Sequence, residues 1–211
     1  MKNYIRFLFS CGIIMFLSEI WKQYCITFII NECRYNWWYF PFQLCSIPMY
    51  LCLLLPFVSE KLREIFLTFL MTFGLMAGFF TFFDTSGLHY PYAPLTVHSY
   101  LWHVLLIIIG ITVGICQSKN DTAGKFPGSA ACYLICCVIA TMINVISHPY
   151  GNINMFYISP YYAMSQKVFE DIARLTGNIA GIFIYIGTNI AGAYVIYLIW
   201  NSSHHQNFNH L

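Results

Sequence analysis

Residues 65–83, IFLTFLMTFGLMAGFFTFF, contain no charged side chain over the length that a helix needs to cross a membrane. The hydrocarbon core of a bilayer is spanned by about 20 mostly apolar residues in α-helical form. A surface helix of a soluble protein would instead carry a charged face. This run therefore predicts a membrane-spanning helix.

Five further stretches have the same apolar character: residues 7–30, 40–58, 97–116, 128–147 and 176–200. The linkers between them are short, polar, or rich in Pro and Gly. The whole chain is 59% hydrophobic and only 9% charged, whereas soluble domains carry about 25% charged residues. We therefore expect an all-α fold, a polytopic transmembrane bundle of about six helices that forms one integral membrane domain over residues 1–211.

The composition argues against several classes of function. The ten Lys and Arg residues are scattered and leave a net charge of only +2, so no nucleic-acid partner is expected. Most of the nine cysteines lie inside apolar runs, no C-x-x-C occurs, and no Cys/His spacing matches a zinc site. We therefore expect neither a metal nor a cofactor.

The Lys and Arg residues of the linkers indicate an orientation, because cytoplasmic loops of membrane proteins are enriched in them. With the N-terminus inside, six of these residues face the cytoplasm and three face the other side. The first group is Lys2, Arg6, Lys61, Arg63, Lys119 and Lys125, and the second is Arg34, Lys167 and Arg174. We therefore expect a multi-pass protein of the cell membrane with both termini in the cytoplasm, including the tail that holds His204, His205 and His210.

This topology brings three polar segments to the non-cytoplasmic face. They are the start of the second span (PFQLCS, 41–46), the start of the fourth (VHSYLWH, 97–103), and the long linker with Asn152, Asn154, Tyr157 and Ser159. The cytoplasmic linkers offer charges but no comparable group of His, Cys and Asn. We therefore expect a functional site to face outward.

Cys45 is the candidate nucleophile of this face. We place it within the first two turns of a helix that starts near Pro41, where unpaired amides and the helix dipole favour a thiolate. Pro48 is expected to kink the same helix. A nucleophilic Cys needs a base, and His103 or His98 enters the membrane from the same side. The alternative is a buried structural cysteine, with both histidines satisfying hydrogen bonds between packed helices.

The two histidines point to different sides of one helix, because five residues correspond to about 140° around its axis. His103 lies deeper and is a functional candidate for that reason, whereas His98 is expected nearer to headgroups or water. Glu19 and Lys22 are three residues apart in the first span and are expected to face the bundle interior. Either they neutralise each other, or Glu19 orients a histidine or lines a polar substrate path.

Three short blocks follow one another along the chain. They are PFQLCSI (41–47), the turn at 82–94 followed by SYLWHVLLI (99–107), and NMFYISP (154–160). In sequence, order and separation they resemble the YwaF family of bacterial integral membrane proteins. The likeness spans about residues 40–165 and extends more weakly to the rest. Two positions depart from the family pattern, since many members have His in place of Gln43 and Lys in place of Ser159. Compared with the family, the chain is also expected to be one helix shorter at its N-terminus.

The YwaF family is similar to a eukaryotic membrane family that transfers acyl chains between phospholipids and lysophospholipids through a Cys and a His. On the matching blocks, that Cys corresponds to Cys45 and that His to His103. The resemblance thus implies a lipid acyltransferase in which Cys45 attacks a phospholipid ester with His103 as the base. Gln43 or Asn154 would donate to the oxyanion, His98 would contact substrate, and membrane lipids are the expected partners.

A second function is a non-catalytic subunit that captures a small solute for transport. Six helices with an outward polar pocket suit this role. The chain contains no G-x-x-x-x-G-K-[ST] pattern, so energy would come from a partner ATPase. The two functions differ in a simple respect, because solute binding would tolerate Cys45→Ala and acyl transfer would not.

Overall fold

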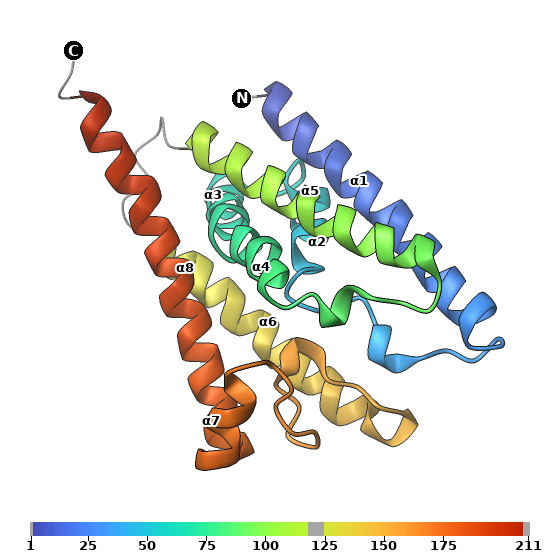
Figure 1. Cartoon of the computed structure of the whole chain (residues 1–211). Coiled ribbons are helices and arrows are strands. Elements are labelled where there is room, and N and C mark those ends of the chain that lie inside the picture. The colour runs from blue at the N-terminus through green and yellow to red at the C-terminus, as the bar shows by residue number, and fades with distance from the viewer. Residues whose placement is uncertain (1, 118–124, 209–211) are drawn as a thin grey trace.

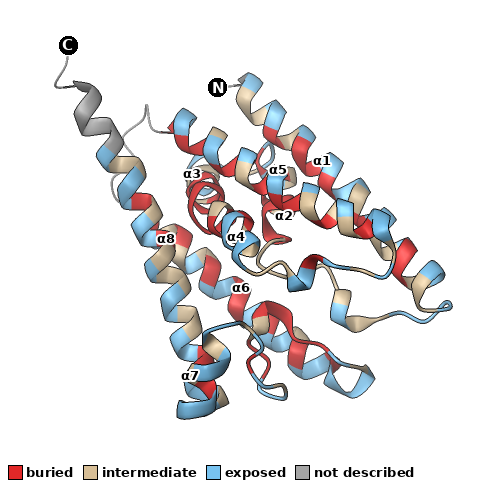
Figure 2. Ribbon diagram, in the orientation of Figure 1, coloured by how far each residue is buried: buried red, intermediate tan, exposed pale blue. Residues whose placement is uncertain are grey.

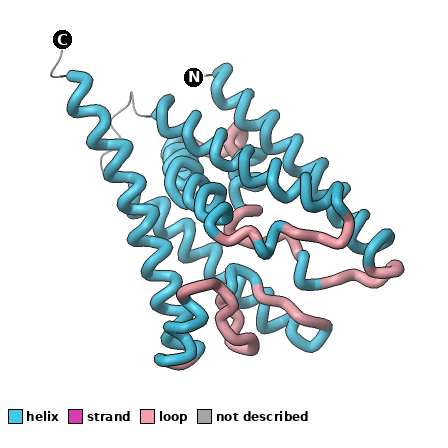
Figure 3. Tube along the Cα trace, in the orientation of Figure 1, coloured by secondary structure: helices cyan, strands magenta, loops and turns pink. Residues whose placement is uncertain are grey.

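All regular structure is helical in the part of the chain that the computed structural model describes, residues 2–117 and 125–208 (Figure 1; Figure 3). The predicted all-α class is confirmed. The side chains of residue 2 and of residues 203–208 are not described either. The orientation markers Lys2 and Lys119 and the tail histidines therefore lie outside the described side chains.

Five helices are long and apolar enough to cross a membrane: Asn3–Ile30, Glu60–Phe83, Ala93–Gln117, Phe126–Tyr150 and Asn178–Ser202. They match all the predicted spans except the second. By its elements, the first is α1 (Lys2–Tyr24) with η1 (Cys25–Ile30), and the next joins α3 (Glu60–Phe69), η3 (Leu70–Gly74), α4 (Leu75–Phe80) and η4 (Thr81–Phe83). The others are α5 (Ala93–Gln117), α6 (Phe126–Ser147) with η6 (His148–Tyr150), and α8 (Asn178–Phe208). The chain is therefore a multi-pass integral membrane protein.

The second predicted span, residues 40–58, is α-helical only in its middle, as α2 (Ile47–Leu54). Pro48 lies in the first turn of α2, a position that suits proline because the amide it lacks would be unpaired there anyway. The expected kink at Pro48 is therefore wrong, and so is a helix start near Pro41. Pro56 follows the last helical residues, where proline commonly ends a helix because it cannot continue one.

Short as it is, α2 carries the chain back along the bundle. Its start lies against α5, where Trp102 Nε1 donates to the carbonyl of Cys45 at 3.0 Å. Just beyond its end, the ring of Phe57 contacts Phe9 of α1, with ring centroids 6.1 Å apart. The end of the bundle that holds Phe9 and Phe57 is called the terminal end, because α1 begins and α8 ends there (Figure 1). An ion pair of 3.0 Å between Lys125 and Glu64 joins the starts of α6 and α3 there.

The opposite end, which we call the loop end, gathers the three long connections. Residues 31–46 contain η2 (Trp37–Tyr39), residues 84–92 contain η5 (Ser86–Leu88), and the connection after α6 contains η7 (Met155–Tyr157) and α7 (Phe169–Thr176). Gln43 donates to the carbonyl of Asn154 at 3.1 Å, and Lys167 pairs with Asp84 at 3.0 Å. Gln43 and Asn154 belong to two of the three polar segments that the sequence predicts on one face, and Trp102 of the third segment binds the carbonyl of Cys45 in the first.

Burial follows the expectation for a bundle surrounded by hydrocarbon (Figure 2). Four of the five long helices bury one side in the core and leave large apolar side chains exposed on the other, among them Ile14, Leu17, Leu101, Ile108, Val138, Phe183 and Ile199. The helix over Glu60–Phe83 is instead buried on all sides from Phe66 to Gly74. Helices approach closely where a small residue permits it. At Gly78 of α4, an added Cβ would lie 3.0 Å from the carbonyl oxygen of His103, so α4 packs directly on the part of α5 that carries this histidine.

Candidate functional site

Cys45 lies in the turn before α2, one residue ahead of the N-cap residue Ser46, and it is partly buried. Burial is the main influence on its thiol and raises the pKa of Cys45, while the nearby Lys22 ammonium acts in the opposite direction. The helix start alone therefore does not supply the thiolate that the sequence predicts. A nucleophilic Cys45 would need a proton acceptor at the time of reaction.

His103 is buried in α5 and oriented by a single hydrogen bond. Its Nδ1 lies 2.8 Å from the carbonyl oxygen of Ser99. A carbonyl only accepts, so Nδ1 carries the proton and Nε2 is left as the basic nitrogen. This tautomer is the one that a general base requires. No hydrogen bond between Cys45 and His103 occurs among the described residues, so their pairing stays a prediction.

His98 is held between two indole rings rather than at an open surface. The ring centroids lie 5.5 Å from Trp21 and 5.7 Å from Trp102. Its Nε2 is buried and has no hydrogen-bond partner in the protein. Because Trp102 also binds the Cys45 carbonyl, His98 and Cys45 contact the same indole. The predicted contact of His98 with substrate stays a prediction.

Glu19 and Lys22 face the interior, as predicted. Their side chains are only 5% and 16% exposed, and Lys22 Nζ lies 2.8 Å from Glu19 Oε2. Gln23 Nε2 donates to Glu19 Oε1 at 2.7 Å and to the carbonyl of Tyr39 at 2.6 Å. The pair therefore neutralises itself and, through Gln23, ties α1 to the connection that leads to Cys45.

Side-chain amides hold the long linker in place at the loop end. Gln43 Nε2 donates to the carbonyl of Asn154, and Gln43 Oε1 accepts from the amide of Phe156 at 2.7 Å. Asn154 Oδ1 accepts from the amide of Ser159 at 2.9 Å. Both predicted substrate contacts, Gln43 and Asn154, thus bind backbone in this structure. Phe156 and Tyr157 have φ of 58°, a strained conformation for bulky residues that surrounding contacts must hold.

Two further amides were missed by sequence reasoning. Asn144 of α6 forms two bonds with Met155, donating to its carbonyl at 3.0 Å and accepting from its amide at 2.6 Å. Asn178, at the start of α8, accepts from Met164 and donates to Tyr162, each at 2.9 Å. Both residues could have been identified in the sequence as lone amides in or beside an apolar helix. Polar groups in a bilayer need hydrogen-bond partners, so such an amide indicates a bond to another segment.

An open cavity of about 420 Å³ lies at the loop end. It is lined by residues of two connections: Ile30, Asn31, Glu32, Arg34, Tyr35, Asn36 and Trp37 from one, and Tyr150, Gly151 and Asn152 from the other. Nothing in the sequence marked this cavity. Among the described side chains, no group of three or more His, Cys, Asp or Glu residues is placed to hold a metal ion.

Comparison with known proteins adds no relative to these observations. No protein-family model, no curated protein and no solved structure matches the chain.

Proposed function

We propose that the chain is a lipid acyltransferase of the YwaF type, with Cys45 as the nucleophile and His103 as the base. The observation that carries the proposal is the bond from Trp102 to the Cys45 carbonyl, which holds the turn of Cys45 against α5. The next residue along α5 is His103, in the tautomer that leaves Nε2 basic. A thiol whose pKa burial raises needs such a base beside it.

The reaction has two steps that balance without a cofactor. In the first, His103 Nε2 takes the thiol proton as Cys45 Sγ attacks the ester carbonyl of a phospholipid. The carbon–oxygen bond then breaks, a thioester remains on Cys45, and the lysophospholipid leaves with the proton from His103. In the second, His103 takes the proton of the acceptor hydroxyl as its oxygen attacks the thioester carbonyl. The carbon–sulfur bond then breaks, the new ester leaves, and the proton passes from His103 to Cys45 Sγ. Gln43 or Asn154 would donate an amide N–H to the oxyanion, Gln43 by giving up its bond to the Asn154 carbonyl.

The experiment is acyl exchange in liposomes that contain the purified protein and a labelled lysophospholipid. We expect Cys45→Ala to lower exchange to the rate of protein-free liposomes, because the covalent route has lost its nucleophile. His103→Ala should lower it by about 10²–10⁴-fold, the usual contribution of a general base. Cys33→Ala, at an exposed cysteine of the same end, is the control and should keep full activity. Unchanged exchange in both Cys45→Ala and His103→Ala would exclude this function. Tight binding of a small solute that survives Cys45→Ala would favour the transport subunit with a partner ATPase.

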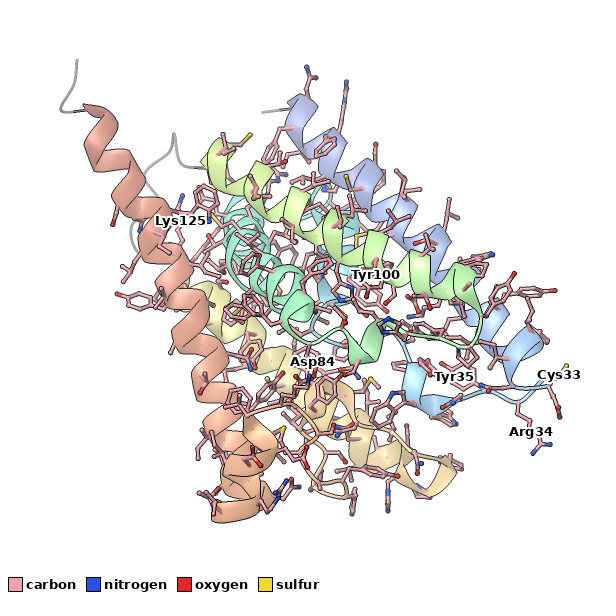
Figure 4. The ribbon with its side chains drawn as sticks, in the orientation of Figure 1. Cys33, Arg34, Tyr35, Asp84, Tyr100 and Lys125 are labelled. Atoms are coloured by element: carbon pink, nitrogen blue, oxygen red, sulfur yellow. The ribbon has the colours of Figure 1, made fainter. Side chains whose placement is uncertain are left out.

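We further propose that the loop end faces outward and the terminal end faces the cytoplasm, as the distribution of Lys and Arg favours. A membrane-impermeant maleimide added to intact cells should label Cys33, which is exposed at the tip of the connection after α1 (Figure 4). In a Cys33→Ser background, a cysteine placed at the exposed Lys61 of α3 should react only after the membrane is permeabilised. The reverse pattern would contradict the orientation and leave the fold unaffected.

A further inference from the structure

The open cavity at the loop end is lined by the connections after α1 and after α6. These two connections meet where Trp37 packs over Gly151. A Cβ added to that glycine would lie 3.4 Å from the Trp37 ring. Tryptophan and tyrosine commonly lie at the depth of lipid headgroups. Trp37, Tyr35 and Tyr150 give the cavity this aromatic character.

The amide groups of the cavity are mainly hydrogen-bond donors. Asn31 Nδ2 is buried and has no partner in the protein. The side-chain oxygen of Asn36 already accepts from the amide of Trp38 at 3.0 Å, and that of Asn152 accepts from the hydroxyl of Tyr162 at 2.7 Å. The side-chain N–H groups of Asn36 and Asn152 therefore remain to donate, and such donors suit phosphate oxygens.

The cavity also carries one charge of each sign. Arg34 and Glu32 are each 85% exposed, and their charged atoms lie 3.9 Å apart, too far for a strong mutual bond. The guanidinium of Arg34 matches a phosphate ester, because its fork of donors can bind two oxygens at once. The carboxylate of Glu32 accepts hydrogen bonds from an ammonium, and the aromatic faces nearby attract the same cation. Figure 4 shows Arg34 at the tip of the connection after α1 and Tyr35 closer to the bundle.

From these groups we infer that the cavity binds the headgroup of a zwitterionic phospholipid, with its phosphate at Arg34 and the asparagine amides and its primary ammonium at Glu32. A phosphate and an ammonium joined by a two-carbon bridge are separated by only a few ångströms, as the two charges of the cavity are. The choice of a lipid rather than a soluble phosphate ester rests on the acyl-transfer proposal.

The test is calorimetric titration of the purified full-length chain in lipid-free detergent. The three probes are dihexanoyl phosphatidylethanolamine, dihexanoyl phosphatidylglycerol and free phosphoethanolamine. We expect the ethanolamine lipid to bind most tightly. Arg34→Gln should lower the affinity for both lipids by about tenfold or more, the value of a charge-assisted hydrogen bond. Glu32→Gln should lower the affinity for the ethanolamine lipid and raise the affinity for the glycerol lipid. The glycerol lipid has no ammonium to lose a partner, and its phosphate gains from removal of a nearby negative charge.

The chain offers a matched control in Arg174 and Glu170, a second exposed ion pair of the same two residue types at the loop end, outside the cavity. Arg174→Gln and Glu170→Gln should leave all affinities unchanged. Equal losses in Arg34→Gln and Arg174→Gln, or an equal effect of Glu32→Gln on both lipids, would overturn the proposed site. Phosphoethanolamine binding as tightly as the lipid would overturn the lipid as its source. Titration of Cys45→Ala separates the two proposals, since retained headgroup binding in a protein that shows no acyl exchange would contradict only the acyl-transfer function.

Discussion

Replacement of Glu19 by Gln is expected to lower the free energy of unfolding by about 3–5 kcal/mol, because it leaves the Lys22 ammonium buried without its counter-charge. The Glu19 side chain is 5% exposed and lies 2.8 Å from Lys22 Nζ. Glutamine keeps an oxygen that can accept the bond from Gln23, so the substitution removes the charge and little else. The effect should therefore be that of an unpaired buried cation.

A double-mutant cycle in mixed micelles measures this effect. Glu19→Gln, Lys22→Gln and the double variant are unfolded by a denaturing detergent, and the free energies are compared. The double variant should be more stable than either single one, since it buries no charge. If the two single effects simply add, Glu19 and Lys22 do not neutralise each other, and Glu19 would instead have a separate partner among the polar residues of the bundle.

Replacement of Asn144 by Leu is expected to lower the free energy of unfolding by about 2–6 kcal/mol, because each buried backbone group left unpaired costs about 1–3 kcal/mol. Asn144 and Met155 are both fully buried, and the amide forms both available bonds to the Met155 backbone. The loss should also release the linker over residues 151–167. Proteolysis of this segment in detergent should then be faster than in the wild type.

Thr141→Val is the matched control on the same helix. Thr141 is an exposed residue, and its hydroxyl donates to the carbonyl of Cys137 within α6, one turn back. That carbonyl belongs to the regular bonding of the helix, so nothing is left unpaired and the change should stay within about 0.5 kcal/mol. Equal effects of Thr141→Val and Asn144→Leu would show that Asn144 does not anchor the linker.

The long helices could be predicted because a bilayer imposes one requirement on every span, a sustained apolar run, and residues 65–83 or 128–147 meet it without ambiguity. The gathering of the polar connections at one end follows from the predicted number of spans, because an even number returns the chain to the end where it began. The structure of residues 40–58 was not predicted in detail. Three prolines lie in that stretch, and composition alone does not tell which of them starts a helix, kinks it or follows it. The contacts show that Pro48 starts α2 and Pro56 follows it.

The sequence nominates candidate residues for a site but does not determine what each of them binds. The buried orientation of Glu19 and Lys22 follows from the cost of charge in hydrocarbon, and it is confirmed. The roles of the amides could not be read in the same way, because a side-chain amide can serve a substrate or the backbone equally well. Gln43 and Asn154 bind the linker backbone, and Asn144 and Asn178 do so from apolar helices. The cavity between residues 30–37 and 150–152 arises from pairing across more than a hundred residues, which no local pattern encodes.

The most direct test of acyl transfer through Cys45 is detection of the thioester itself. The purified protein is incubated with a phospholipid that carries a deuterated acyl chain, without an acceptor, and digested for mass spectrometry. The account predicts one added acyl group on the peptide that contains Cys45, removed by neutral hydroxylamine and missing in Cys45→Ala. Acyl exchange by the wild type with no label on this peptide, or a label of the same amount in Cys45→Ala, would contradict it.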